Sequence, residues 1–245
     1  MLSKSEAKYI QSLSQKKVRA LAQCFIIEGP KIVEEAISIC PAKIKEVFAL
    51  ESWATAHKQG LRNIKLTIID DKELSRISQL TTPNQVLALV EMPPATDFHF
   101  NAEKLSLALD GIQDPGNMGT ILRIADWFGI SQVICSPDCA DVYSPKVVQA
   151  TMGSIFRIQT CYVDLADWLK NKQGLPRYGA ALQGEDLAFF KGTTKGILVI
   201  GNESKGISDG VRGTLSRLVT IPRYGNAESL NAAVATGIIL SHFKN

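Results

Sequence analysis

The stretch Ile221-Pro-Arg-Tyr-Gly-Asn-Ala-Glu-Ser-Leu-Asn-Ala-Ala-Val-Ala235 decides the fold, because a strand end, a loop and a helix start follow one another within it. The apolar run 218–221 predicts a buried strand, which Pro222 and Gly225 bring to an end. Ser229 is placed to cap the helix that continues to the C-terminus. The first N–H groups of a helix have no partner within it, so they can face a ligand held by the loop.

The same order of strand, loop and helix occurs at two earlier places. The strand predicted at 105–110 runs into Asp110-Gly-Ile-Gln-Asp-Pro-Gly-Asn-Met-Gly119 and then into a helix. The strand predicted at 196–201 ends in the triplet Gly-Asn-Glu at 201–203. Ligands of open α/β sheets bind at the carboxyl ends of the strands, so these three loops form the candidate site.

The region 105–245 alternates strand and helix signals throughout. Strands are predicted at 105–110, 131–136, 158–163, 178–182, 196–201 and 218–222, and helices at 117–128, 144–156, 165–173, 207–216 and 229–243. Such alternation indicates an α/β fold, with a mainly parallel sheet and helices on both faces.

A smaller α/β domain is predicted ahead of this region. Helical spacing separates four predicted strands, near 25–28, 44–50, 65–69 and 86–91. The segment Met92-Pro-Pro-Ala-Thr-Asp97 carries two prolines and ends the pattern. The predicted division is therefore a first domain at 1–92, a linker at 93–104 and a second domain at 105–245.

The bulk composition excludes several classes of protein. The chain has 245 residues, 45% of them apolar, and no apolar run approaches the roughly 20 residues of a membrane span. The first fifteen residues are polar, so neither export nor a membrane anchor is expected. Five cysteines without a Cys-x-x-Cys pair favour reduced thiols in a cytoplasmic protein and give no zinc ligand set.

The formal charge of +3 does not by itself indicate a nucleic-acid partner. The distribution of charge is more informative, because five basic residues near the start of the chain face only Glu6: Lys4, Lys8, Lys16, Lys17 and Arg19. This segment is either a basic surface that attracts phosphates or an ordinary solvated helix face.

Taken together, the three loops resemble the signature motifs of the SpoU class of RNA 2'-O-ribose methyltransferases, in the SPOUT superfamily. The resemblance covers about 105–245 and rests on three ordered patterns: Asn-x-Gly-x-x-x-Arg at Asn117, Gly119 and Arg123, Gly-Asn-Glu at Gly201, Asn202 and Glu203, and Ser-Leu-Asn at Ser229, Leu230 and Asn231. Any one of these motifs alone would be weak evidence, whereas three in order are specific.

The resemblance implies a fold, a cofactor and partners. It implies a deep trefoil knot near the C-terminus that holds a bent S-adenosylmethionine, and a homodimer packed through the second domains. It also implies that the first domain binds the RNA substrate, with ribosomal RNA favoured over transfer RNA.

The resemblance also implies roles for single residues. Arg123 lies next to the attacking ribose hydroxyl, and a general-base role is proposed for its counterpart in the family. A guanidinium stays protonated in proteins, so binding a phosphate and stabilising the developing alkoxide are physically easier roles. Four further residues complete the catalytic set: Asn117, Glu203, Ser229 and Asn231. Glu203 would orient Arg123 or the backbone.

The cofactor site should consist mostly of backbone and apolar groups, since adenine needs a flat slot and a few amide partners. By their positions in the motifs, the resemblance implies that Gly201, Ile221 and Leu230 bind the cofactor. Further candidates lie at the end of another predicted strand: Leu182, Gln183 and Gly184.

Plainer readings of the same residues remain open. Ile221 and Leu230 could be core residues, Gly201 a tight turn and Ser229 only a cap, and Glu203 could form a structural ion pair with Arg123. Two rival RNA functions also remain, a transfer RNA 2'-O-methyltransferase and a non-catalytic RNA-binding ribosome-assembly factor. A nicotinamide-dependent dehydrogenase is disfavoured, because the loop 111–119 does not spell Gly-x-Gly-x-x-Gly.

Overall fold

The structure is a computed structural model that describes residues 2–245, and its contacts divide the chain into two compact units. The first unit comprises the chain up to Pro94 together with Tyr143–Phe156, and the second comprises Ala95–Val142 and Arg157–Asn245. The grouping places Tyr143–Phe156 with the first unit and divides the predicted linker 93–104 between the two units. The predicted domain boundaries otherwise stay a prediction.

The first unit is built on a four-stranded sheet with the order β1-β4-β2-β3. Strand β4 (Val86–Glu91) lies antiparallel to both β1 (Cys24–Glu28) and β2 (Ile44–Ala49), and β3 (Leu66–Ile68) lies parallel to β2. Each of these strands lies where alternation and apolar content predict it. Because β1 and β3 are the outer strands, the unit has two sheet edges.

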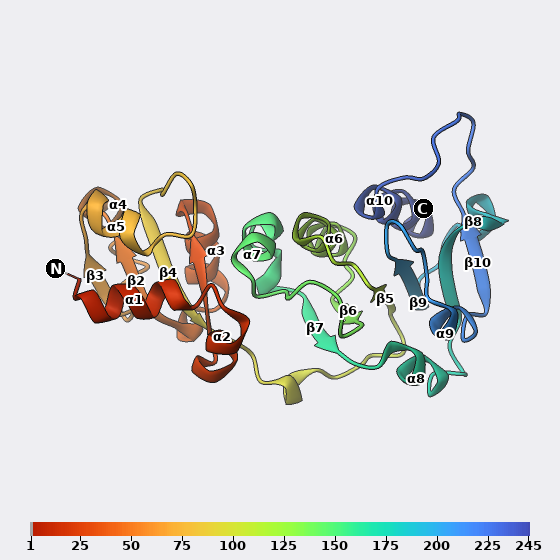
Figure 1. Cartoon of the computed structure of the whole chain (residues 1–245), viewed down its shortest axis with the longest axis horizontal. Coiled ribbons are helices and arrows are strands. Elements are labelled where there is room, and N and C mark those ends of the chain that lie inside the picture. Colours follow the sequence, from red (N-terminus) through yellow and green to blue (C-terminus); the bar gives the residue numbers. More distant parts are fainter. Residues whose placement is uncertain (1) are drawn as a thin grey trace. The chain divides into compact units, whose positions relative to one another are not determined.

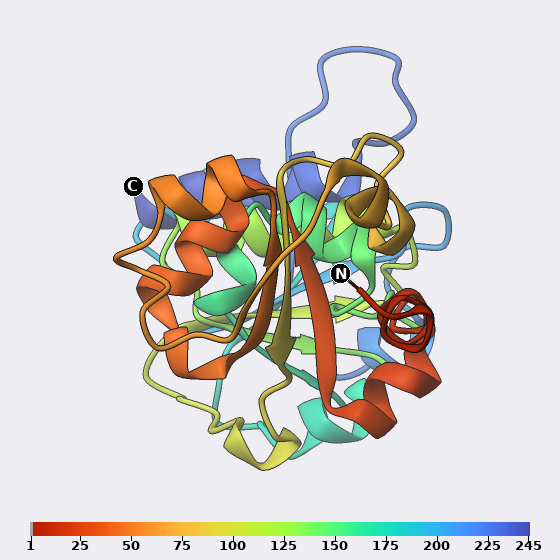
Figure 2. The ribbon, with the colours of Figure 1, turned by 90° about the vertical axis from the view of Figure 1, so that its left-hand side faces the viewer.

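Helices cover both faces of this sheet (Figure 2). Helices α1 (Lys4–Ser12) and α5 (Asp71–Ile77) share one core with the sheet, and α3 (Pro30–Ile39) and α4 (Glu51–Ala56) share the other. Helix α7 (Pro145–Thr151) lies against β1, and its Val148 is buried in the second of these cores. The helix is followed by a short 3-10 turn, η3 (Ser154–Phe156).

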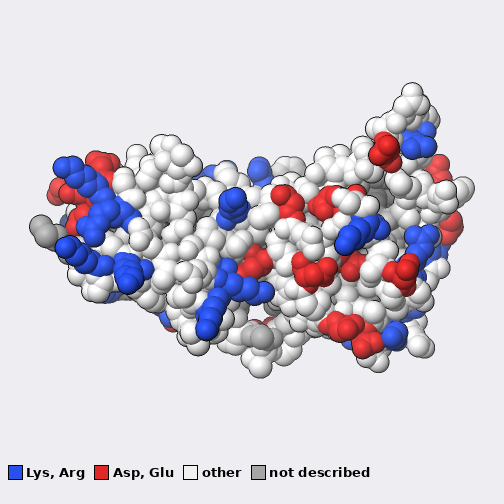
Figure 3. All heavy atoms as spheres, viewed as in Figure 1, with Lys and Arg blue, Asp and Glu red and all other residues white. Residues whose placement is uncertain are grey.

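One of the five basic residues near the start of the chain does not contribute to its surface. Arg19, on α2 (Lys16–Ala22), is 2% exposed, and its guanidinium donates hydrogen bonds to the carbonyl oxygens of Leu13 and Ser14 at 2.8 and 2.7 Å. Arg19 is therefore a structural residue, because its charge serves to satisfy buried carbonyls. The lysines remain exposed, and Figure 3 shows basic atoms gathered over α1 and α2.

The second unit contains a six-stranded sheet in which every pair of neighbouring strands is parallel, in the order β10-β8-β9-β5-β6-β7. The strands are β5 (Leu105–Asp110), β6 (Gln132–Cys135), β7 (Gln159–Tyr162), β8 (Arg177–Asp186), β9 (Gly196–Gly201) and β10 (Arg217–Thr220). The predicted α/β fold with a mainly parallel sheet is confirmed.

Helices cover both faces of the second sheet (Figure 1). Helices α8 (Leu165–Lys170) and α9 (Asp209–Arg212) pack on the face that carries Ala108 and Val199. Helices α6 (Pro115–Trp127) and α10 (Ala232–Lys244) pack against each other on the opposite face. This unit also contains the short 3-10 turns η2 (Ala95–Asp97) and η4 (Leu187–Phe190). The first unit contains the 3-10 turn η1 (Pro41–Lys43).

Several predicted helices are shorter than expected, and the difference is largest for two of them. The helix predicted at 144–156 breaks after Thr151, because Met152 and Gly153 adopt φ angles of 50° and 95°, in the left-handed region that ends a helix. The helix predicted at 207–216 is reduced to α9, since Gly210 within it and Gly213 directly after it weaken helical preference. No helix within 2–245 is long and apolar enough to cross a membrane.

Candidate active site

The site lies where the order of strands reverses direction. From β5 the chain continues to β6 and β7 on one side, whereas β9, β8 and β10 lie on the other. Asp110 at the end of β5 is the Cα partner of Gly201 at the end of β9, so the first two motif loops leave the sheet side by side. Such a switch point, at the carboxyl ends of parallel strands, is the usual ligand site of open α/β sheets.

The Gly-Asn-Glu motif forms a tight turn that is fastened to the first loop. Asn202 and Gly206 exchange backbone hydrogen bonds of 3.0 and 2.9 Å, and a Cβ on Gly201 would lie 2.3 Å from the carbonyl carbon of Gly206. Glycine is therefore required at 201 by the close approach of its own turn. The Asn202 side-chain amide donates to the carbonyl oxygen of Gly111 at 2.7 Å.

A chain of side-chain hydrogen bonds joins all three motifs. Asn117 is the third residue of α6, and its amide nitrogen donates to Oε1 of Glu203 at 2.6 Å. The amide nitrogen of Asn231 donates in turn to Oδ1 of Asn117 at 2.8 Å. Because a carboxylate can only accept, Glu203 fixes which way the Asn117 amide faces, and that amide then fixes Asn231.

Asn231, rather than the predicted Ser229, caps the C-terminal helix. Its Oδ1 accepts the backbone N–H groups of Ala233 and Val234 at 2.9 and 3.3 Å, so α10 begins at Ala232 instead of 229. Both residue types are good caps, and the additional bond to Asn117 favours Asn231. Ser229 is exposed and makes no side-chain hydrogen bond with any described residue.

Arg123 lies six residues beyond Asn117 on α6 and is exposed. Within residues 2–245 its guanidinium has no hydrogen-bond or ion-pair partner. A contact with Glu203, one of the two roles expected of that carboxylate, is absent there, and Glu203 accepts from Asn117 instead. A free guanidinium keeps all its donors available for a carboxylate-like or phosphate group.

The expected cofactor residues are brought to neighbouring strand ends, with their apolar side chains still open to solvent. Gly184 lies in β8, where a Cβ would meet the Leu218 carbonyl oxygen at 2.6 Å, and Ile221 directly follows the adjacent strand β10. Leu182 is 70% exposed and Leu230 is 47% exposed. The loop 221–231 that carries Leu230 projects from the unit (Figure 1). Exposed leucines beside strand-end backbone and the exposed Gln183 fit an adenine, which needs apolar walls and amide partners.

Three groups that support the site were not predicted. Asp114 caps α6 by accepting the N–H of Asn117 at 2.8 Å, and Asp110 accepts the N–H of Ser208 at 2.7 Å. Ser136 accepts the N–H of Gly111 at 2.8 Å. The order Asp-Pro-Gly at a helix start signals the first of them in the sequence. The other two depend on contacts between distant strands.

Cys139 supports the same turn from the other side. Its Sγ accepts the N–H of Ile112 at 3.3 Å and donates to the carbonyl oxygen of Leu109 at 3.2 Å. A hydrogen bond from the Cys135 thiol, aided by Ser136, lowers the pKa of Cys139 to about 7. No group of three His, Cys, Asp or Glu residues in the described part of the chain could hold a metal ion.

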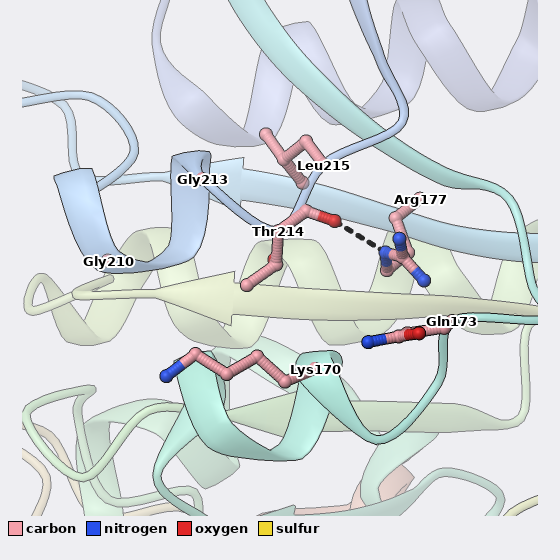
Figure 4. A pocket seen from close by; sticks show the side chains of 7 residues that line it. All are labelled: Lys170, Gln173, Arg177, Gly210, Gly213, Thr214 and Leu215. Carbon is pink, nitrogen blue, oxygen red and sulfur yellow. Dashed lines mark hydrogen bonds between the residues drawn. The ribbon is translucent and has the colours of Figure 1, made fainter.

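A separate hollow of about 500 Å³ lies at the amino ends of β8 and β10, away from these loops (Figure 4). The side chains of Lys170, Gln173 and Arg177 line it. Arg177 donates to the carbonyl oxygen of Thr214 at 2.5 Å and to two further carbonyl oxygens, so it is held in the wall. The hollow therefore takes no part in the site at the carboxyl ends.

A parallel α/β sheet with three linked loops at its switch point and a free arginine defines a methyltransferase of the SpoU type. The SpoU rRNA Methylase family model matches residues 104–241, and the model of an MRM3-like substrate binding domain matches residues 4–88. The chain belongs to the SpoU rRNA methylase family, as its motifs predict.

Proteins of similar sequence or structure match this chain over nearly its whole length. The 23S rRNA (guanosine(2553)-2'-O)-methyltransferase RlmP of Bacillus subtilis is 31% identical over 243 residues, covering 96% of this chain and 94% of its own. The AdoMet-bound rRNA methyltransferase from Sinorhizobium meliloti has a TM-score of 0.85 at 31% identity, covering 99% of this chain and 96% of its own. The SpoU methyltransferase AviRb from Streptomyces viridochromogenes, in complex with the cofactor AdoMet, has a TM-score of 0.85 at 27% identity, covering 98% and 97%.

Proposed function

We propose that the chain transfers the methyl group of S-adenosylmethionine to a ribose 2'-hydroxyl of ribosomal RNA. The observation that carries this proposal is the hydrogen-bonded chain from Asn231 through Asn117 to Glu203, which joins all three family motifs beside the free guanidinium of Arg123. A chain that had kept the fold and lost the activity would have no reason to retain this set.

The chemistry requires positioning more than activation. A ribose hydroxyl is a poor nucleophile near neutral pH, whereas S-adenosylmethionine, when bound, supplies a methyl group already activated by its sulfonium. The protein must therefore hold hydroxyl and methyl in line and stabilise the charge that develops on the ribose oxygen. The rigid strand ends of β5 and β9 are suited to that task.

Arg123 is the group available to contact the RNA. Its free guanidinium binds a phosphate next to the target ribose and stabilises the developing alkoxide, while the proton leaves to a phosphate oxygen or to water. Asn117, Glu203 and Asn231 hold one another and act as positioning residues. Ser229, in the exposed loop, is left free to bond ribose or phosphate.

The cofactor would be held by three neighbouring strand ends and the loop 221–231. Gly201, Gly184 and Ile221 offer backbone at the carboxyl ends of β9, β8 and β10. Leu182 and Leu230 offer exposed apolar surface, and Gln183 offers an amide. Burying the two leucines against adenine would contribute favourable free energy, which supports their assignment.

Two observations support an RNA substrate, and the first of them favours ribosomal RNA. Three relatives that match 78% or more of this chain are named 23S rRNA methyltransferases, and a fourth, which matches 95% of it, is named a tRNA/rRNA methyltransferase. The first unit matches a substrate-binding domain model and presents exposed lysines on α1 and α2, which would attract an RNA backbone.

The substrate is tested by supplying labelled S-adenosylmethionine with unmodified ribosomal RNA and transfer RNA in parallel reactions. Label in ribosomal RNA, at a linkage that resists alkaline hydrolysis, is expected. Label in transfer RNA alone would show that transfer RNA, and not ribosomal RNA, is the substrate. Cofactor binding without methyl transfer to any RNA would favour an assembly factor.

A cytoplasmic homodimer is part of the proposal. All five cysteines are free, which suits a reducing compartment. Val234 and Ile238 lie one turn apart on α10 and are 50% and 39% exposed, so one face of this helix offers apolar surface to a second copy.

The dimer is tested by light scattering at micromolar concentration. A dimer mass is expected for the wild type, and Ile238→Glu should shift the population toward monomer because a charge would be buried at the contact. Lys244→Glu, on an exposed residue of the same helix, is the matched control. A monomer mass for the wild type would end the dimer proposal.

A further inference from the structure

A second pocket lies entirely within the first unit, at the outer edge of β1. It has a volume of about 400 Å³ and is formed by β1, the residues that follow α5 and the start of α7. Its inner surface is apolar, with Ile26 and Val148 both buried and Leu80 and Pro145 partly exposed. We call it the β1–α7 pocket. Its size lies within the range of small-ligand sites, about 300 to 1,000 Å³.

One wall of the β1–α7 pocket carries a buried carboxyl group. Glu28, the last residue of β1, is 5% exposed, and it accepts hydrogen bonds from the Ser78 hydroxyl at 2.5 Å and from the Gln79 N–H at 2.7 Å. Burial raises the pKa of this carboxyl group above its ordinary value. Each carboxyl oxygen can accept more than one hydrogen bond, so Glu28 is oriented by the protein and retains acceptor capacity.

The opposite wall carries two unengaged polar side chains on α7. Lys146 and Gln149 lie three residues apart and therefore on one face of the helix. Neither side chain has a hydrogen-bond or ion-pair partner among residues 2–245. The pocket thus has a floor that suits flat apolar groups, an acceptor at its inner end and donors at its rim.

This combination matches an unpaired nucleobase. A base has two apolar faces and an edge of N–H donors and acceptors, and it is followed by a phosphate that an ammonium group can bind. Single-stranded RNA is recognised in this way, with splayed bases stacked on side chains and bonded along their edges. A protein partner would need both an apolar side chain for the floor and a carboxylate for the rim ammonium, whereas one nucleotide carries the base and the phosphate together.

We propose that the β1–α7 pocket binds one unpaired base of the RNA substrate, with Glu28 accepting an N–H from the base edge and Lys146 contacting the adjoining phosphate. The proposal rests on the proposed function, because it gives the RNA of that reaction a second point of contact. The pocket would contribute to the choice of RNA substrate, whereas Arg123 would act at the ribose that is methylated.

The test compares variants of the rim in the full chain. Lys146→Ala and Gln149→Ala change exposed or partly exposed side chains without partners, and Lys72→Ala is the matched control, an exposed lysine without a partner in the same unit. Affinity is measured with deproteinised ribosomal RNA at several salt concentrations. Lys146→Ala should weaken RNA binding about tenfold and lower the slope of log affinity against log salt by about 1. Gln149→Ala should weaken RNA binding about threefold.

Photocrosslinking provides a second measurement that needs no variant. Irradiation of the wild-type protein with RNA containing 4-thiouridine should attach nucleotides to peptides that contain residues 78–81 or 145–150. The proposal is overturned if these peptides carry no nucleotide and both rim variants bind RNA as Lys72→Ala does. Methyl transfer by the wild type in that case would leave the proposed function standing, whereas a wild type that neither binds nor methylates RNA would remove both.

Discussion

Asn117 is the residue on which the other motif side chains depend, because its amide group bonds to both Glu203 and Asn231. The two bonds use one donor and one acceptor of the same amide, so neither partner can be kept if the amide is lost. The bonded groups lie 86 and 114 positions away in the chain. Asn117 therefore couples three loops that the sequence leaves far apart.

Substitutions at this residue test the coupling. Asn117→Ala should lower kcat about a hundredfold, with the affinity for S-adenosylmethionine less affected, because the loops lose their shared alignment. Asn117→Asp should be at least as harmful near neutral pH, since it places a second carboxylate within 2.6 Å of the position where Glu203 accepts. Activity of Asn117→Asp should recover as the pH falls and the pair takes up a proton. Equal activity of wild type and Asn117→Ala would contradict the positioning role.

Glu28 gives the protein a pH dependence of stability with a definite sign. Its pKa is raised on folding from an ordinary value of 4.5, because burial disfavours the charged form. The folded state then binds more protons than the unfolded state, so the stabilising contribution is full below the unfolded pKa and is lost as the pH rises through the folded pKa.

Urea unfolding of wild type and Glu28→Gln between pH 4 and pH 7.5 measures this effect. The wild-type free energy of unfolding, relative to that of the variant, should fall as the pH rises, because glutamine does not titrate. A difference that rises with pH would show that the hydrogen bonds from Ser78 and Gln79 outweigh burial.

Among the elements, β5 and β9 coincide with their predicted bounds, and both are apolar runs that end in residues typical of turns. The helices were harder to predict. Two residues suitable for capping lie two positions apart at 229 and 231, and local pattern cannot choose between them. The choice depends on the bond from Asn231 to a side chain on α6, which exists only after the sheet has formed.

The same reasoning explains what was missed at the site. The three motifs identify their residues from the sequence, but Glu203 was expected to orient Arg123 or the backbone, and the structure pairs it with Asn117. The sequence cannot reveal this partner, since Glu203 lies in the turn after β9 and Asn117 in the first turn of α6, and their distance depends on how β5 and β9 pair. The tight turn that follows Gly201 was one of two interpretations of this glycine, the other being a cofactor-binding residue.

Gly201→Ala tests the requirement for a close backbone approach at the end of β9. The added Cβ would lie within 2.5 Å of three backbone atoms of the turn, which cannot move as a side chain can. The free energy of unfolding should fall by more than about 2 kcal/mol, and the turn that carries Glu203 should shift. Gly225→Ala is the control, because no atom lies within 4 Å of a Cβ there. Equal thermal unfolding of the two variants would contradict this account.

For the molecule as a whole, the pattern of the chain predicts both sheets but not the membership of every helix. Periodicity shows that α7 has a buried face, and it does not show that Val148 enters the core of the first unit. By lying against β1, α7 covers an outer strand that would otherwise be open to pairing with another chain. The trefoil knot stays a prediction of the family resemblance, because no periodicity reveals a threaded chain.

The central claim is that Arg123 acts on RNA while the cofactor is held elsewhere in the second unit. The most direct measurement is methyl transfer to unmodified ribosomal RNA by wild type and Arg123→Ala, combined with calorimetric titration of each with S-adenosylmethionine. Transfer should fall about a hundredfold to a thousandfold in the variant, with the cofactor affinity unchanged. Undiminished transfer by Arg123→Ala would contradict the account.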